Sequence, residues 1–262
     1  MNASNVGMAQ VWARGAAMLA LLLLAAPSRA TTVEITDCGQ TVPDRALGVL
    51  TTDIVCTSSA TSVFIGERAK LDFRGHTITA GGVWCHGACT LRGPGTITDA
   101  QPWTEFGQNS GIFTGTWDGK LTVKNLTIDN CFHGIASNAS KVTLSNVVVT
   151  NSTHNGIHVY GRLRAKDVTA SDNGDTGVFA AGDLAQVKVV GLTAIGNGWG
   201  GLACQGPSTV VVRSTLTGNA FPPFPGTPTA LDLISATLPR VIDTTCDHSW
   251  GDAAPWGVCA GD

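Results

Sequence analysis

The chain has 262 residues, of which only 13% are charged, and its formal net charge is −3. Charged residues make up about 25% of a typical soluble domain, and we find no basic cluster in this sequence that follows one face. The composition therefore argues against nucleic-acid binding, and we predict no nucleic-acid partner.

Residues 1–30 have the pattern of an export signal. Arg14 precedes an apolar run at 16–26, and Ser28-Arg29-Ala30 has the small residues of a cleavage site. The run is shorter than the ~20 residues that a membrane-spanning helix needs, and no later stretch qualifies. We expect an exported protein without a membrane span, whose mature chain begins near Thr31. Without the two arginines of this segment, 14 basic and 19 acidic residues remain, a net charge of −5.

Residues 63–235 contain a short pattern that recurs about every 22 residues. Within 141–161, for example, 142–144 and 156–160 alternate between apolar and polar residues, 147–149 is a run of three valines, and turns separate the three segments. This predicts three short strands per copy and leaves no room for a helix. The third strand of each copy opens with a Gly followed by an apolar residue, at Gly111, Gly134, Gly156, Gly177 and Gly201.

Two further markers keep step with the glycines. Asn tolerates the left-handed backbone of a sharp turn between strands, and stacked Asn side chains can hydrogen-bond along a ladder. One marker lies between the first two strands, at Asn125, Asn146, Asp167 and Gly191. The other follows the second strand, at Asn130, Asn151, Asn173, Asn197 and Asn219.

Self-similarity at this period is typical of a solenoid. We predict an all-β fold, a parallel β-helix of about seven to eight three-strand coils whose inward aliphatic side chains form one continuous core. Residues 31–262 are expected to be a single domain, with an N-terminal cap at 31–62, coils at 63–235 and a C-terminal cap at 236–262.

The repeats resemble those of the right-handed parallel β-helix proteins of the pectate-lyase-like superfamily. The resemblance covers roughly Phe64 to Ser235, and the segment from Cys38 through Cys56 to Ile78 is similar to the usual entry to such domains. It implies a right-handed helix. It implies no particular activity, because the superfamily includes lyases, hydrolases, esterases, epimerases and non-catalytic spike or adhesin modules.

Eight cysteines in an exported chain favour disulfides. Cys131 and Cys204 are expected to stay unpaired, because they belong to coils three apart, ~14 Å along a stack with ~4.8 Å per coil. A disulfide needs Cα atoms within ~7 Å. We predict the pairs Cys38–Cys56, Cys85–Cys89 and Cys246–Cys259.

In enzymes of this superfamily the substrate lies along the strand that begins at the Gly marker, together with the polar turn before it. In this chain, alternation turns Ile157 and Val159 inward and His158 and Tyr160 outward. The same register places Phe113, Ala136, His158, Phe179 and Ala203 in one outward ladder. The preceding turns add His133, His154, Asp175 and Trp199, so that the polar members lie within roughly 10 Å of each other.

This cluster is the predicted site. In a catalytic role, His158 serves as a general base near neutral pH, Tyr160 donates a proton to a leaving oxygen, and Asp175 assists. The alternative is that these residues only decorate an exposed sheet. The predicted ligand-binding residues are His133, His154, Phe179, Trp199 and Trp103, whose aromatic members offer flat faces to sugar rings.

The catalytic sets known in the superfamily are missing. Ca²⁺-dependent lyases need several carboxylates on adjacent coils, and the outward ladders carry none. The Asn-Thr-Asp, Asp-Asp and Gly-His-Gly motifs of polygalacturonases are also absent. A zinc site from the three histidines lacks helical or Cys-rich spacing, so we predict no metal and no cofactor. A metal-free lyase with Arg162 as its base is a further alternative.

We therefore expect a secreted protein that binds carbohydrate, a polysaccharide or a cell-surface glycan, along the outward face of the Gly-marked strands. The first alternative is a polysaccharide lyase or glycoside hydrolase of unassigned type that uses His158 and Tyr160. The second is a structural surface or adhesin module. The sequence contains no coiled-coil or other assembly segment, and it defines no oligomeric state.

Overall fold

The computed structural model describes residues 31–56, 62–100, 110–220, 231–251 and 254–262. The predicted export signal and Trp103 lie outside these residues. Residues 32–262 form one compact unit. All regular structure in the described ranges is β, with 25 strands and no helix, and these ranges contain no helix able to cross a membrane.

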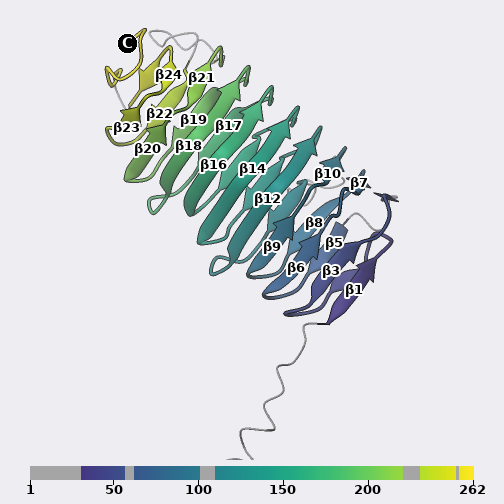
Figure 1. Cartoon of the computed structure of the whole chain (residues 1–262). Coiled ribbons are helices and arrows are strands. Elements are labelled where there is room, and N and C mark those ends of the chain that lie inside the picture. Colours follow the sequence, from purple (N-terminus) through teal and green to yellow (C-terminus); the bar gives the residue numbers. More distant parts are fainter. Residues whose placement is uncertain (1–30, 57–61, 101–109, 221–230, 252–253) are drawn as a thin grey trace, which may run out of the picture. The chain divides into compact units, whose positions relative to one another are not determined.

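The strands of this unit form two parallel sheets, and each turn of the chain contributes to both (Figure 1). One sheet has 10 strands, which we call the short-strand sheet. Its strands, in spatial order, are β2 (Thr41–Val42), β5 (Ser62–Ile65), β8 (Gly82–Cys85), β11 (Ile112–Thr114), β13 (Ile135–Ser137), β15 (Ile157–Val159), β17 (Thr176–Ala180), β19 (Gly200–Cys204), β22 (Leu233–Ser235) and β25 (Ser249–Trp250).

The other sheet has 15 strands and bends along its length, and we call it the bent sheet. Its main path is β1 (Thr32–Ile35), β3 (Leu47–Leu50), β6 (Ala69–Asp72), β9 (Cys89–Arg92), β12 (Lys120–Asp129), β14 (Lys141–Thr150), β16 (Arg162–Ser171), β18 (Gln186–Ile195), β20 (Ser208–Val212) and β23 (Arg240–Ile242). Beside this path lie β4 (Ile54–Val55), β7 (Thr77–Thr79), β10 (Thr96–Thr98), β21 (Thr215–Thr217) and β24 (Thr245–Cys246).

The predicted first and second strands of each copy are one continuous strand in the middle of the unit. The strands at 142–144 and 147–149, for instance, are both part of β14, which bends at Asn146. The bend residues have left-handed backbone, with φ 54° at Asn125 and 51° at Asn146, and Asn146 Nδ2 donates to Asn125 Oδ1 at 3.1 Å. Because the bend residues of successive coils lie side by side, β12 and β14 pair both before and after the bend.

The marker after the second strand is wrong by one residue in the later coils. The left-handed residue there is Asn130, Asn151, Asp172, Gly196 and Gly218 in successive coils. The residue after it points into the core, and it is Cys131, Ser152, Asn173, Asn197 and Asn219. The left-handed positions and the inward positions were taken for one repeated marker in the sequence, because Asn occurs in both sets.

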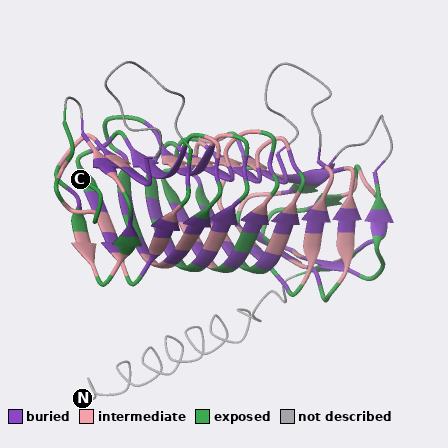
Figure 2. Ribbon diagram, turned by 90° about the horizontal axis from the view of Figure 1, so that it is seen from above, coloured by how far each residue is buried: buried purple, intermediate pink, exposed green. Residues whose placement is uncertain are grey.

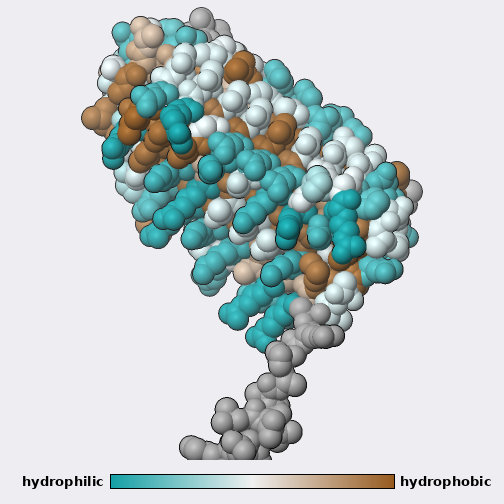
Figure 3. All heavy atoms as spheres, in the orientation of Figure 1, coloured by the Kyte–Doolittle hydropathy of each residue, from teal (hydrophilic) through white to brown (hydrophobic). Residues whose placement is uncertain are grey.

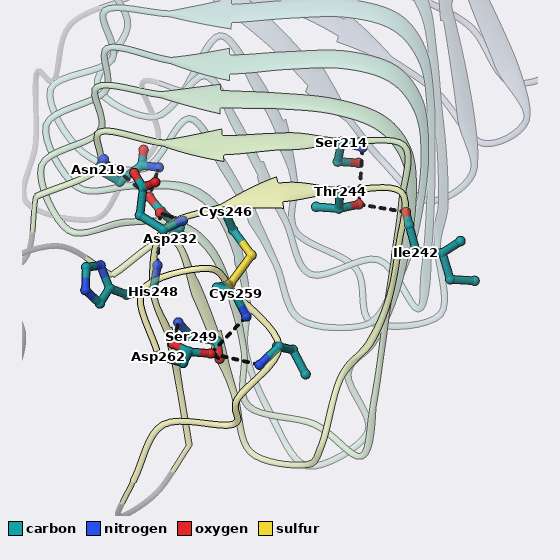
Figure 4. The surroundings of a disulfide bond; sticks show 12 residues. Ser214, Asn219, Asp232, Ile242, Thr244, Cys246, His248, Ser249, Cys259 and Asp262 are labelled. Atoms are coloured by element: carbon teal, nitrogen blue, oxygen red, sulfur yellow. Dashed lines mark hydrogen bonds between the residues drawn. A yellow bond between two sulfur atoms is a disulfide. The ribbon is translucent and has the colours of Figure 1, made fainter.

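The inward Asn side chains form a buried ladder. Asn173 Nδ2 donates to Asn197 Oδ1 at 2.9 Å, and Asn197 Nδ2 donates to Asn219 Oδ1 at 2.8 Å. Asn219 Nδ2 in turn donates to Asp232 Oδ1 at 2.7 Å. Asp232 Oδ2 accepts the backbone N–H of Asp247, which ties the ladder to the last coil (Figure 4). Each polar group of the ladder is thus paired within the core, as burial requires.

The remaining inward positions are aliphatic and form one core through all coils. Ile135, Ile157, Val178 and Leu202 pair at successive levels of the short-strand sheet, and each is 0% exposed. Figure 2 shows buried residues alternating with exposed ones along the strands. Burial of one such side chain contributes about 1.5–3 kcal/mol, so the core stabilises the stack, and the predicted all-β solenoid is confirmed.

The three predicted disulfides are also confirmed. The Cα–Cα distances are 5.5 Å for Cys38–Cys56, 6.0 Å for Cys85–Cys89 and 5.1 Å for Cys246–Cys259. Cys131 and Cys204 are buried and unpaired, as predicted.

The residues predicted to cap the two ends continue the same ladders. β1 pairs with β3 and β2 with β5 at one end, while β23 pairs with β20 and β25 with β22 at the other. Near the Cys246–Cys259 bond, the Asp262 carboxylate accepts hydrogen bonds from Ser249 and from the backbone of Val258 and Cys259 (Figure 4). Burial alone would raise the pKa of Asp262, but these hydrogen bonds together lower it.

Candidate functional site

The outward positions of the short-strand sheet form a column that crosses almost every level of the stack. The sequence predicted its middle part, and strand pairing confirms that register. Strand pairing also extends the column in both directions. We call it the aromatic column, and it consists of Phe64, Trp84, Phe113, Ala136, His158, Phe179, Ala203, Ile234 and Trp250.

The rings of this column touch in two groups, Phe64–Trp84–Phe113 and His158–Phe179, which Ala136 separates. The ring centroids are 6.0 Å apart for Phe64–Trp84, 5.2 Å for Trp84–Phe113 and 5.1 Å for His158–Phe179. Their planes are tilted or perpendicular, the arrangements that aromatic pairs prefer. Phe64 remains 40% exposed. The face is therefore a row of rings that is packed on its inner side and open to solvent on its outer side.

Around His158 of the column, three histidines from two successive coils meet, His133 before β13 and His154 and His158 at β15. His133 lies with its ring centroid 5.4 Å from that of His154 and 5.7 Å from that of His158, and His158 lies 4.7 Å from Tyr160. Phe132, which the sequence analysis did not select, packs on His154 at 4.0 Å. Of the predicted site residues, the structure thus brings together His133, His154, His158, Tyr160 and Phe179.

Two imidazoles of the cluster, those of His133 and His158, have lowered pKa values. Burial, together with the neighbouring His158 and His154, lowers the pKa of His133 to about 4, and burial lowers the pKa of His158. The ring nitrogens His133 Nδ1, His154 Nδ1 and His158 Nε2 are buried without a hydrogen-bond partner in the described part of the chain. A neutral imidazole nitrogen can donate or accept according to its tautomer, so these atoms suit hydroxyl groups of a ligand.

Asp175 and Trp199 continue from this cluster into the following coils, where the Asp175 N–H donates to the His154 carbonyl at 3.2 Å and the Trp199 N–H to the Asp175 carbonyl at 3.1 Å. With Asn155, Thr176 and Phe179 they line a depression of about 250 Å³, and the structure shows no hydrogen bond from Asp175 to His158 or Tyr160. Trp199 and Phe179 also line the next depression, of about 270 Å³, together with Gln205 and Ile234. The predicted aromatic residues therefore continue the binding face, whereas Asp175 is not in contact with the proposed base.

No group of three or more His, Cys, Asp or Glu side chains in the described ranges is arranged to hold a metal ion. The ring centroid of His133 lies 5.4 Å from that of His154 and 5.7 Å from that of His158, with the planes inclined at 59° and 61°. The chemistry that this site offers is therefore ring stacking and hydrogen bonding.

Sequence reasoning missed Trp84 and Trp117. Trp84 follows Gly82-Val83 in the same pattern as the later coils, but the insertion at 99–110 breaks the period between them. Trp117 belongs to a turn rather than to a strand, so alternation does not place it. It is 63% exposed, and its ring centroid lies 5.8 Å from that of Tyr160.

A correction concerns charge. The sequence analysis found no basic cluster along one face, and this was wrong. The outward positions of β12, β14, β16 and β18 gather seven cations, which pairing between coils aligns. Pairing between coils makes neighbours of residues about 21 apart in the chain. The cluster is therefore not apparent in any short segment of the sequence. Its members are Lys120, Lys124, Lys141, Arg162, Arg164, Lys166 and Lys188.

Comparisons with known proteins agree with the fold. Residues 109–221 match the protein family described as "Right handed beta helix region". The structure is similar to the crystal structure of a double mutant of the periplasmic alginate epimerase AlgG, with a TM-score of 0.36 and 8% identity, over 88% of this chain and 79% of that chain. A search of curated proteins finds no match. The chain thus contains a right-handed β-helix region, as its repeats predicted.

Proposed function

We propose that this right-handed β-helix protein binds a carbohydrate chain along the aromatic column. The observation that carries the proposal is the composition of the column, which is aromatic or apolar at every level from Phe64 to Trp250. A sheet with one solvated face normally places polar residues outward. Rings in these positions are better explained by a ligand with apolar ring faces of its own.

The geometry fits a sugar polymer better than a compact ligand. Successive rings are spaced by one strand, ~4.8 Å, and a pyranose ring has a similar length. The apolar C–H face of a sugar can pack on the column, while its hydroxyl groups meet the polar edge formed by His133, His158 and Tyr160. These side chains are neutral or hydroxylic, so this face makes no demand for charge on the sugar.

A second candidate, a polysaccharide lyase or glycoside hydrolase of unassigned type, is favoured by the contact between His158 and Tyr160. Because burial lowers the pKa of His158, its imidazole is neutral at pH 7 and can accept a proton. Hydrolysis by the usual route needs two carboxylates on one face, and the described part of this face has none in contact with His158. The pair is therefore better suited to a base and an acid in an elimination.

Binding of the full chain to a panel of polysaccharides, measured by affinity electrophoresis and calorimetry, tests the proposal. Trp84→Ala and Phe179→Ala are expected to weaken binding by roughly tenfold each. Ile195→Ala is the matched control, because Ile195 is 39% exposed on the bent sheet. The proposal is wrong if no polysaccharide binds, or if the control weakens binding as much as the ring variants do.

The second candidate is tested on any polysaccharide that binds, by the absorbance of unsaturated products and by reducing-end release. Turnover that disappears in the His158→Ala, Tyr160→Phe double variant would establish it. Turnover that survives in this variant would exclude these two residues as the acid and base.

A further inference from the structure

The cations on the outward side of the bent sheet are aligned in columns. Lys120, Lys141 and Arg162 are direct partners on β12, β14 and β16, and Arg164 pairs with Lys188 on β18. Neighbouring strands are ~4.8 Å apart. We call the seven residues Lys120, Lys124, Lys141, Arg162, Arg164, Lys166 and Lys188 the basic face, and all of them are exposed.

Among the described residues, few carboxylates lie near these cations: Asp167 is beside Lys166, and Asp118 lines one depression with Lys120, Lys141 and Arg162. Only Lys166 has a carboxylate within 4.0 Å among the described residues, at 3.7 Å from Asp167 Oδ2. Like charges directly opposite each other on a sheet destabilise it. The chain as a whole is negative, with a net charge of −3, so these cations are concentrated here rather than spread evenly. Such segregation indicates a binding surface for an anion.

The surface is also hollowed. Lys124, Arg164, Lys166 and Lys188 line a depression of about 460 Å³ whose floor includes Leu144. At the edge of the basic face, a second depression of about 550 Å³ is lined by the cations Lys120, Lys141 and Arg162, by one carboxylate, Asp118, and by the rings of Trp117 and Tyr160. Figure 3 shows hydrophilic side chains gathered in rows over the side where these strands begin.

From these observations we propose that the basic face binds a linear anionic polysaccharide that lies along the stack and carries acidic groups at intervals of about one coil. Successive acidic groups of the polymer would then each contact a cation on a successive coil. The site lies on a different sheet from the aromatic column, so this proposal does not depend on the function proposed above.

Nucleic acid fits the surface less well. The strands β12, β14, β16 and β18 contain no aromatic residue, whereas single-stranded nucleic acid is usually bound through bases stacked on such residues. Duplex recognition needs a protruding element that enters a groove, and a pleated strand face has none. The three disulfides also fit an oxidising compartment outside the cytosol.

The test measures binding of the full chain to dextran sulfate, carboxymethyl dextran and unmodified dextran, at several salt concentrations. We expect the two charged polymers to bind with an affinity that falls steeply with salt, because binding releases counterions. Comparing sulfate with carboxymethyl groups identifies the preferred acid, and unmodified dextran controls for the polymer backbone.

The triple variant Lys120→Gln, Lys141→Gln, Arg162→Gln is expected to bind the charged polymers about tenfold more weakly, with a shallower salt dependence. The matched control, Arg45→Gln, Arg74→Gln, Arg213→Gln, removes the same charge from exposed arginines outside these four strands, and it should leave the affinity within about twofold. Since the first variant relieves repulsion between neighbouring cations, it should fold at least as stably as the wild type.

Equal loss in both triple variants would overturn the proposal, because it would show a response to net charge alone. Salt-independent binding or no binding of either charged polymer would overturn it as well. Duplex DNA, single-stranded DNA or phosphatidylserine vesicles could bind more tightly than the charged dextrans. If that binding is lost in the first variant, the face belongs to another class of partner and the proposal is wrong. Phe179→Ala should leave binding of the charged polymers unchanged, which separates this site from the aromatic column.

Discussion

Acidification should destabilise the β-helix through His133. In the folded protein the pKa of this side chain is about 4, below its ordinary value of 6.5, because the ring is buried against His158 and His154. Between pH 6.5 and pH 4, the unfolded chain therefore binds a proton at His133 and the folded chain does not. The contribution of neutral His133 to the free energy of unfolding is present above pH 6.5 and is lost as the pH falls toward 4.

The magnitude follows from the size of the shift. Each pKa unit corresponds to 1.36 kcal/mol, so the difference between 6.5 and about 4 amounts to roughly 3 kcal/mol at most. Most of this, about 2–3 kcal/mol, should already be lost at pH 4.5. Urea denaturation at pH 7 and pH 4.5 measures the loss. His133→Gln cannot be protonated, so its free energy of unfolding should decrease less over the same interval, by about 2–3 kcal/mol.

Two results would refute this reasoning. The first is an equal decrease in the free energy of unfolding for the wild type and His133→Gln. The second is a His133 imidazole resonance that titrates above pH 6. His154→Gln provides a further check: it removes a neighbouring group whose electrostatic interaction lowers the pKa of His133, so that pKa should rise part of the way toward its ordinary value.

Three further predictions concern the stack itself. Asn197→Ala should lower the free energy of unfolding by about 2–4 kcal/mol, because it leaves two buried partners unpaired, and the exposed control Asn151→Ala should have a smaller effect in the same urea titration. Gly134→Ala should unfold at markedly lower urea, because its Cβ would lie 2.1 Å from Val149 Cγ1, and native-like stability would contradict the close coil packing. Burial raises the pKa of the Cys131 thiol to about 12, so this thiol should react with a disulfide reagent at pH 8 only after unfolding.

The fold was predictable because its determinants are local and repeated. Alternation along β15 places His158 outward and Ile157 inward whatever lies elsewhere in the chain, and pairing then carries the same register to Phe179. The left-handed bend at Asn146 likewise needs only a residue that tolerates that backbone. These two rules are enough to predict which residues pair between β13, β15, β17 and β19, and the predicted partners were correct.

The site was predictable where a strand determined the direction of the side chain, and only in part in the turns, where His133 and His154 meet as expected. Asp175 lies in a turn, where alternation gives no direction, and its predicted role beside His158 has no contact to support it. Trp84 was missed because the insertion at 99–110 interrupts the count. The basic face was missed because Lys141 and Arg162 are neighbours only across coils.

Repetition itself argues for polymeric partners on both surfaces. A small ligand needs the side chains of one or two levels, yet the aromatic column extends over the levels from β5 to β25 and the basic face over β12 to β18. The edge where Trp117 and Tyr160 face Lys120 brings ring stacking and positive charge within one depression. A polysaccharide with both apolar ring faces and acidic groups can therefore contact the two surfaces at once. For a polymer that occupies both surfaces, the Phe179→Ala and Lys120, Lys141, Arg162 variants would weaken binding additively, since the two sets share no contact; for the charged dextrans, which we expect on the basic face alone, only the second variant should weaken it.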